Sequence, residues 1–437
     1  MTKKSISAIV LIVVVTILCS CSKSDSIDSQ LTSEKSSSFD GPTREEQWSE
    51  DIEILSSSLK SIHKGLYDNI SEEKFNSEME FLKSNISNLD DQEMTIKIMK
   101  LIAGIGDGHT YVMYLDFLGE SVLPIKFAWK NEKLLCVNAT PRYSNMLHSE
   151  IVSINGKPVD EIFTELMSLA SGENDYRRTY IALGLVRLPS VYEYLKQTAN
   201  GDSINFTYKK KDVEETMLVD SVLYKEDQES KYILDNRINS ITSPLDSLLE
   251  NPYSYEYDED NKIMVLRYDQ CFDYDSTFRE FNLEFWKAVE QNEVEKIVVD
   301  LRYNSGGDSE LFNPFRIMLN RNKEFDNPDK LYVLIGNRTF SSANMTAIKM
   351  EKLTNATLIG EPTGNAPNHY SDPHGRNYIT LPNSGIRFRC TDTFFELYPD
   401  YKYSYLMPDK LVKVKIDDYV TGTDSCYEYI LEQGIKQ

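Results

Sequence analysis

The segment "KIVVDLRYNSGGDSELFNPFRIML", residues 296–319, carries the clearest structural pattern in the chain. Its apolar run at 297–299 predicts a buried strand, and the part after the glycine pair predicts a helix. Gly306 and Gly307 lack side chains, so their N–H groups can approach a ligand oxygen closely, as an oxyanion hole requires. A tight strand-to-helix turn without chemistry is the alternative interpretation.

The same architecture returns in "LYVLIGNRTFSSANMTAIKMEKLTNATLIGEPTG", residues 331–364. An apolar strand at 331–335 leads through a polar turn into a second helix, and "ATLIG" predicts another strand. Ser341 and Ser342 fall at the helix start, where serines usually cap free amides. The same place also suits a nucleophile, because the N–H groups and partial positive charge of a helix N-terminus stabilise an oxyanion.

Length and composition limit the class of protein. A chain of 437 residues exceeds the size that one hydrophobic core usually supports, so two or three structural units are expected. With 41% apolar and 27% charged residues, the composition is that of a folded globular protein. The net charge of −22 argues against nucleic acid and anionic lipid surfaces as partners.

The N-terminus has the organisation of an export signal. In "MTKKSISAIVLIVVVTILCSC" a basic head precedes an apolar run at 9–18 and a small-residue end. The stretch from Leu18 to Cys21 resembles the lipobox of bacterial lipoproteins, which implies removal of residues 1–20, a lipid on Cys21 and a cell-envelope location, periplasmic or surface-facing. A plain N-terminal anchor helix is the alternative. Residues 21–40 are rich in serine and predict a flexible tether.

The rest of the chain divides into three predicted regions. Residues 41–118 have apolar residues at helical spacing, predict three helices and end in "GDGHT". Residues 119–225 are strand-rich, and the Asn155-Gly156 turn before a helix near Val159 is similar to part of a PDZ domain, which captures chain ends by strand addition. Residues 226–437 contain both strand–turn–helix units and form the predicted catalytic domain.

Histidine and cysteine are two further residue types that can take part in catalysis or bind a metal. His109 in "GDGHT" is compatible with a catalytic base and with an ordinary polar turn residue. His63, along the first predicted helix, is assigned no role. The four cysteines after the lipidation site are widely spaced without a CxxC, so we expect small core residues and no metal site: Cys136, Cys271, Cys390 and Cys426.

Five motifs together resemble one family. "GDGHT", "VVDLRYNSGG", "NRTFSSANM", "LIGEPTG" and "LMPDKLV" occur in the order found in tail-specific, or C-terminal-processing, serine peptidases and the related tricorn core protease. The resemblance covers about residues 45–430. It implies a ClpP/crotonase-like α/β catalytic domain with a helical N-terminal region and a PDZ-like α/β segment, and no cofactor.

The resemblance also implies roles for individual residues. Ser341 matches the nucleophile of the family, and Ser342 is the near alternative. The oxyanion hole of the family combines an amide of the glycine turn with the amide after the nucleophile, which here means Gly306 or Gly307 together with Ser342.

The general base separates two branches of the family. Tail-specific members use a lysine about 25 residues after the serine, but this chain has no lysine between Lys352 and Lys402. Tricorn-type members use a histidine from the early part of the chain, and "GDGHT" places His109 there. The resemblance therefore implies His109 as the base that takes the Ser341 proton.

The acid that orients the base is left open among three carboxylates. Asp107, Glu396 and Asp400 all compete, and Asp400 is favoured. His369 and His374 fall where relatives carry the lysine, and they either shape a substrate groove or lie in a loop. Their spacing makes no metal site.

The sequence as a whole predicts an envelope-anchored serine endopeptidase. Its substrates would be unfolded or peptide-like polypeptides, hydrolysed through an acyl-enzyme, and its only membrane contact would be the N-terminal lipid. The alternative from another class is a catalytically inactive lipoprotein that binds peptides or other ligands on the same scaffold.

Overall fold

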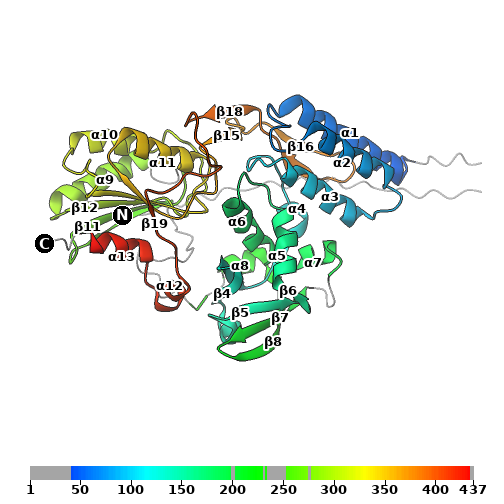
Figure 1. Ribbon diagram of the computed structural model, residues 1–437, viewed down its shortest axis with the longest axis horizontal. Helices are drawn as coiled ribbons and strands as arrows, with labels where there is room; N and C mark the ends of the chain where they lie inside the picture. The colour runs from blue at the N-terminus through cyan, green and yellow to red at the C-terminus, as the bar shows by residue number, and fades with distance from the viewer. Residues whose placement is uncertain (1–40, 198–201, 230–231, 234–251, 274–276, 434–437) are drawn as a thin grey trace, which may run out of the picture. The chain divides into compact units, whose positions relative to one another are not determined.

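The computed structural model describes residues 41–197, 202–229, 232–233, 252–273 and 277–433 (Figure 1). Residues 42–437 form one compact unit. The predicted signal peptide, the tether and Cys21 lie outside the described residues. Within the described ranges, no helix combines the length and apolarity that a membrane span requires.

Three helices open the described chain, as their apolar spacing predicts. Thr43 and Asp90 each form a capping box with the glutamate three residues later, and the Ser71 side chain accepts a hydrogen bond from the Lys74 amide. These caps satisfy amides that would otherwise lack partners at the helix starts. The helices are α1 (Arg44–Ile62), α2 (Glu72–Ser84) and α3 (Asp91–Gly104).

The following region is built around an antiparallel sheet in the order β3-β4-β5-β7-β8, with β6 paired to β5. Asn155 and Gly156, both with positive φ, make the predicted turn between β5 and β6. The strands are β3 (Ile125–Lys130), β4 (Lys133–Ala139), β5 (Glu150–Ile154), β6 (Lys157–Pro158), β7 (Ser203–Lys210) and β8 (Val213–Asp220). The helices are α5 (Val159–Ser168), α6 (Asp175–Leu185) and α7 (Pro189–Tyr194).

The C-terminal half contains a six-stranded sheet in the order β10-β11-β12-β13-β14-β19. Its strands run parallel apart from β10. The predicted apolar strands are present as β12 and β13, each followed by a helix. The strands are β10 (Tyr253–Asp258), β11 (Ile263–Tyr268), β12 (Lys296–Asp300), β13 (Leu331–Ile335), β14 (Thr357–Gly360) and β19 (Lys410–Leu411). The helices are α9 (Phe278–Gln291), α10 (Asn313–Arg321), α11 (Ser342–Leu353) and α13 (Ser425–Glu432).

One hairpin of the C-terminal half packs with the N-terminal helices. β16 (Tyr378–Thr380) and β17 (Arg387–Arg389) form a three-stranded sheet with β1 (Tyr111–Val112), which follows "GDGHT" directly (Figure 1). Leu381 and Phe388 are buried in the same hydrophobic core as α1 and α3. The pairing therefore brings the early histidine motif to the C-terminal half.

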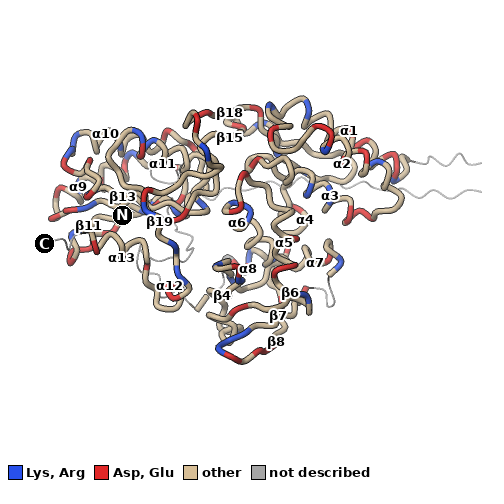
Figure 2. The backbone as a smooth tube through the Cα atoms, viewed as in Figure 1, with Lys and Arg blue, Asp and Glu red and all other residues tan. Residues whose placement is uncertain are grey.

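The predicted core cysteines are confirmed. The four cysteines among the described residues are buried and free: Cys136, Cys271, Cys390 and Cys426. Figure 2 shows basic and acidic residues interspersed along the described helices and strands.

A buried aspartate ties α1 to the hairpin loop. Asp51 Oδ1 accepts a hydrogen bond from the Asn383 amide at 3.0 Å, and Oδ2 accepts one from the Ser384 amide at 2.7 Å. Asp51 has no exposed surface. The loop amides thus depend on a side chain more than 300 positions away in sequence.

Asp51→Ala should lower the free energy of unfolding by about 1–3 kcal/mol, because two amides of the hairpin loop lose their buried acceptor. Chemical denaturation followed by circular dichroism measures the change. Glu50→Ala is the matched control: Glu50 also reaches Asn383, but it is exposed, and its loss should change stability by less than about 0.5 kcal/mol. Equal effects of the two substitutions would contradict the assignment.

Candidate active site

The carboxyl ends of three neighbouring parallel strands supply the glycine turn, Ser341 and Asn365. The chain leaves β12 into the turn with Gly306 and Gly307, leaves β13 into Ser341, and leaves β14 toward Asn365. Ligand sites of open α/β sheets lie at this edge, because the loops that follow the strands converge there.

Ser341 has the backbone of a strained turn at the start of α11. Its φ of 54° and ψ of −126° are unusual for a residue with a side chain, and such conformations cost about 1–3 kcal/mol. Its amide donates to Asn365 Oδ1 at 2.9 Å, while its hydroxyl makes no hydrogen bond with a described residue and does not cap the helix. The capping interpretation therefore does not hold for Ser341.

Ser342 uses its hydroxyl differently. Its Oγ donates to the Gly307 carbonyl oxygen, and the residue is buried. The first amide of α11 nevertheless belongs to Ser342 and makes no bond within the helix. This arrangement favours Ser341 over Ser342 as the residue with an available hydroxyl.

The glycine turn requires both glycines. Gly306 has φ of 106°, and a Cβ there would lie 2.7 Å from the Ser341 Cβ. Gly307 has φ of 138°, and a Cβ there would lie 2.3 Å from the Cys271 carbonyl oxygen. Only glycine therefore allows this turn to pack between Cys271 and Ser341.

The two glycine amides differ in their availability. Gly306 donates its N–H to Asn304 Oδ1 at 2.8 Å, so that amide is already used. Gly307 forms a parallel bridge with Cys271. In this bridge the Cys271 amide donates to the Gly306 carbonyl oxygen, and the Cys271 carbonyl oxygen accepts from the Asp308 amide. The N–H and C=O of Gly307 itself consequently point to the other side, toward Ser342. The amides of Gly307 and Ser342 therefore donate to no described residue and are available to a ligand oxygen.

His109 lies in a stack of three rings with Phe340 and His369. Its ring centroid is 4.4 Å from that of Phe340, the residue before Ser341, and 5.4 Å from that of His369. Both ring nitrogens are buried and make no hydrogen bond with a described residue. Burial, helped by the neighbouring His369, lowers the pKa of His109 well below its usual value. The imidazole is therefore neutral near pH 7 and able to accept a proton.

Asp107 and His63 form a buried pair next to His109. Asp107 Oδ1 accepts from the His109 amide at 2.9 Å, and Oδ2 accepts from Thr391 Oγ1 at 2.7 Å and lies 3.2 Å from His63 Nε2. His63 Nδ1 accepts from the Gly65 amide, so Nε2 carries the proton. Burial acts to raise the pKa of Asp107, but the His63 hydrogen bond and the electrostatic interaction with the two nearby histidines lower it overall.

His63 is a residue that the sequence pattern missed. The structure buries it against Asp107, although its place near the end of an amphipathic helix gave it the appearance of an ordinary packing residue. Its pairing with an acid 44 positions away is a tertiary contact.

Glu173 is a second missed residue. Its Oε1 accepts from Asn365 Nδ2 at 3.1 Å, and its Oε2 is buried without a hydrogen-bond partner among the described residues. Burial, with the charge of Asp107, raises the pKa of Glu173 to about 8. The sequence gives little indication of a role for Glu173, because "SGEND" predicts an ordinary loop before a helix.

Three side chains of the site could be considered as metal ligands. Asp107, His109 and Glu173 each offer one ligand atom, and within the described residues these atoms lie within 4.8 Å of one another. Both oxygens of Asp107 already accept hydrogen bonds. We therefore describe the group as an acid–base cluster and assign no metal to it.

The structure does not bring the favoured orienting acid to His109. Asp400 follows β18 (Thr393–Glu396) in an exposed turn with φ of 62°, and it makes no hydrogen bond with a described residue. Glu396 is also exposed. His374 is exposed, whereas His369 is buried against His109.

The second histidine of the stack has a defined tautomer. His369 Nδ1 lies 3.0 Å from the Ala366 carbonyl oxygen, which can only accept, so Nδ1 carries the proton. Asn344 of α11 donates to the same carbonyl at 3.2 Å. Burial lowers the pKa of His369, so this ring is also neutral near pH 7.

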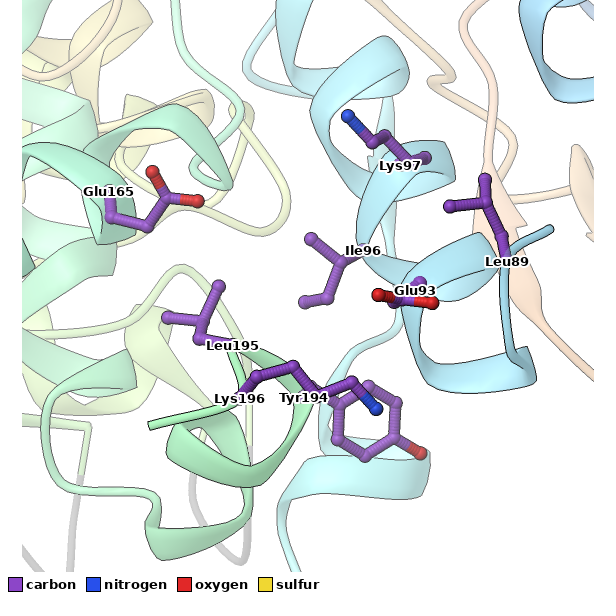
Figure 3. A pocket seen from close by; sticks show the side chains of 8 residues that line it. All are labelled: Leu89, Glu93, Ile96, Lys97, Glu165, Tyr194, Leu195 and Lys196. Carbon is purple, nitrogen blue, oxygen red and sulfur yellow. The ribbon is translucent and has the colours of Figure 1, made fainter. Parts of the chain in front are cut away.

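A separate pocket of about 180 Å³ lies between α3, α5 and the end of α7 (Figure 3). None of the predicted site residues lines it. Its lining combines apolar and charged side chains: Leu89, Glu93, Ile96, Lys97, Glu165, Tyr194, Leu195 and Lys196.

The sequence profile of peptidase family S41 matches residues 262–371, which include the glycine turn and both serines. This stretch of the chain is therefore similar to the serine peptidases of family S41. The α/β fold with a helical N-terminal region agrees with this assignment, and polypeptides are the substrates that it indicates.

Solved structures share the fold of this peptidase. Mature CPAF in complex with lactacystin is 13% identical, with a TM-score of 0.59, and the match covers 89% of this chain and 97% of CPAF. A second structure of mature CPAF is 14% identical with a TM-score of 0.57, covering 90% and 99%. At this identity the likeness shows a common fold. No curated protein matches the chain.

Gly307→Ala should prevent the glycine turn from forming, because its Cβ would meet a backbone oxygen and the positive φ would be strained. We expect a loss of about 2 kcal/mol or more in the free energy of unfolding, measured by chemical denaturation. Gly104→Ala is the control, since a Cβ there meets no atom within 4 Å. An unchanged stability in the Gly307 variant would contradict the described turn.

Proposed function

We propose that this peptidase hydrolyses peptide bonds through an acyl-enzyme on Ser341, with His109 as general base and the Gly307 and Ser342 amides as oxyanion hole. The observation that carries the proposal is the strained Ser341 backbone, which leaves its hydroxyl without a partner beside two available amides. The His109 ring stacks on Phe340, the residue before the nucleophile.

The chemistry follows from these positions. Ser341 Oγ attacks the carbonyl carbon of the scissile bond while a ring nitrogen of His109 takes the hydroxyl proton. The negative charge that develops on the carbonyl oxygen is stabilised by the two amides and by the N-terminus of α11. His109 then returns its proton to the leaving amine, and an ester to Ser341 remains. Water repeats the sequence, releases the carboxylic acid and restores the serine.

The depressed basicity of His109 suits this role. A neutral imidazole can accept the serine proton at once, and its low pKa makes the subsequent transfer to the amine favourable. The hydrogen bond between Ser341 and His109 is not formed in this structure, since neither ring nitrogen bonds to a residue in the described part of the chain. Catalytic hydrogen bonds are commonly long before substrate binds and shorten in the complex.

Unfolded or peptide-like chains are the proposed substrates. The strand-rich segment at 119–225 would grip a chain end by strand addition if it works as its similarity to a PDZ domain implies. β8 supports this idea as an edge strand of the five-stranded path, with most of its residues exposed. The family match favours catalysis over the alternative of an inactive binding lipoprotein.

Ser341→Ala should abolish cleavage of a fluorescent casein substrate and labelling by a fluorophosphonate probe, because the nucleophile is removed. His109→Ala should lower kcat/KM by about 100-fold or more. Ser342→Ala is the matched control: its hydroxyl only contacts the Gly307 carbonyl, so it should still be labelled. Labelling that survives in the Ser341 variant but is lost in the Ser342 variant would reverse the assignment. A wild-type protein that neither cleaves nor reacts would support the binding alternative.

An envelope location is also proposed, on the basis of the lipobox-like stretch before Cys21. Cys21→Ser should move the full-length chain, expressed in a Gram-negative host, from the membrane fraction to the soluble periplasmic fraction, because a thioether lipid can no longer form. Cys19→Ser should leave the anchoring intact. Membrane association that persists in the Cys21 variant would favour a plain anchor helix.

A further inference from the structure

One carboxylate oxygen of Glu173 lies near the proposed catalytic histidine and has no hydrogen-bond partner among the described residues. Its Oε2 and both nitrogens of His109 are buried and make no hydrogen bond with a described residue. A ligand atom of each residue lies within 4.8 Å of the other. Buried polar groups without partners are rare in native proteins and call for a functional explanation.

We propose that Glu173, held by Asn365, is the positioning carboxylate that orients His109 for its role at Ser341; this inference rests on the proposed function. Asn365 connects the parts of the site, since its Nδ2 donates to Glu173 Oε1 and its Oδ1 accepts from the Ser341 amide. One side chain thereby fixes both the acid and the backbone of the nucleophile.

The competing acids are less suited to this role. Both oxygens of Asp107 are occupied, by the His109 amide on one side and by Thr391 and His63 on the other. Asp400 is exposed and makes no hydrogen bond with a described residue. Glu173 has a buried oxygen to offer.

Local packing keeps the acid close to the base. A Cβ at Gly108 would lie 2.8 Å from Glu173 Oε2 and 2.9 Å from Phe340 Cε2, so glycine at this position lets the carboxylate approach the chain beside His109. Because these atoms are at most 4.8 Å apart, a movement of at most about 2 Å would give a normal hydrogen bond of about 2.8 Å. Such hydrogen bonds commonly tighten when substrate binds.

Glu173 and His109 together must lose one proton before they can act as the proposed acid–base pair. Burial raises the pKa of Glu173 to about 8, and burial lowers the pKa of His109. At neutral pH the pair is therefore a carboxylic acid beside a neutral imidazole. To orient His109, the Glu173 carboxylate must accept a hydrogen bond from one ring N–H. The other ring nitrogen then carries no proton and can accept the Ser341 proton. The working form appears when the pair loses one proton.

Several charged groups set this equilibrium. Asp107 opposes ionisation of Glu173, while Arg177 of α6 and the Gly108 backbone favour it. His369, Arg389 and Arg177 oppose protonation of His109, and Asp107 favours it. The two titrations are coupled, so the pH profile reports the pair and not either residue alone.

Glu173→Gln tests the role with little structural change, because the amide oxygen can still accept from Asn365. In the wild type, kcat/KM should rise with pH through an apparent pKa near 8. In the Glu173→Gln variant the rise of kcat/KM should occur at lower pH, because His109 then titrates alone. The kcat/KM reached at high pH should fall by about 100-fold. Asp400→Asn and Glu396→Gln should keep the wild-type profile.

A measurement without turnover separates this inference from the proposed function. In the Ser341→Ala background, the imidazole ¹⁵N shifts of His109 report its pKa and which nitrogen carries the proton. Adding Glu173→Gln should lower that pKa and change the tautomer ratio, whereas adding Asp400→Asn should change neither. An unaltered His109 spectrum with Glu173→Gln would overturn the proposal. If instead the spectrum changes while the wild-type protein cleaves nothing, the proposed function fails and the Glu173 pairing stands.

Discussion

The short antiparallel pairing of β1 with β17 is the contact on which the site depends. Tyr111 is paired with Arg389, and Val112 with Phe388, so two stretches nearly 280 positions apart become neighbours. Closing so large a loop costs conformational entropy, and two residue pairs alone would not compensate for it. The shared hydrophobic core of α1, α3 and the β16–β17 hairpin supplies the remaining stabilisation. The "GDGHT" motif reaches Ser341 because of that core.

The site combines several features that are unfavourable for local stability. Ser341 has positive φ, two glycines occupy conformations that a side chain would forbid, and buried nitrogen and oxygen atoms lack partners. Elsewhere helices are capped and strands are paired as their sequences predict. Such conflicts are expected where function is favoured over local stability. Several of these features lie in the ring stack of His109 and in the glycine turn.

Burial also decides the electrostatics of the site. The imidazoles of His109 and His369 are held neutral because an apolar environment disfavours their charged forms, and the same environment keeps Glu173 protonated. Only Asp107 is held ionised, by a set of hydrogen bonds and histidine neighbours. A cluster with little net charge can be buried and still hold one proton that it exchanges during the reaction.

Much of the fold was readable from local patterns. The three capped helices, the Asn155-Gly156 turn and the strands β12 and β13 follow from apolar spacing and turn residues, because these features depend on near neighbours. The early histidine and the late serine were predicted from the family resemblance. Those predictions did not depend on knowing where the intervening chain lies.

The partners of these residues were decided by tertiary structure alone. His63, Glu173 and Asn365 come from separate segments and have no distinctive neighbours in sequence, and the acid favoured from the resemblance, Asp400, lies exposed in a turn. The sequence by itself determined the elements and the types of reactive residue, because periodicity and turn chemistry are local. Only the folded chain decided which acid faces which base, because that depends on long-range packing and on the burial that shifts each pKa.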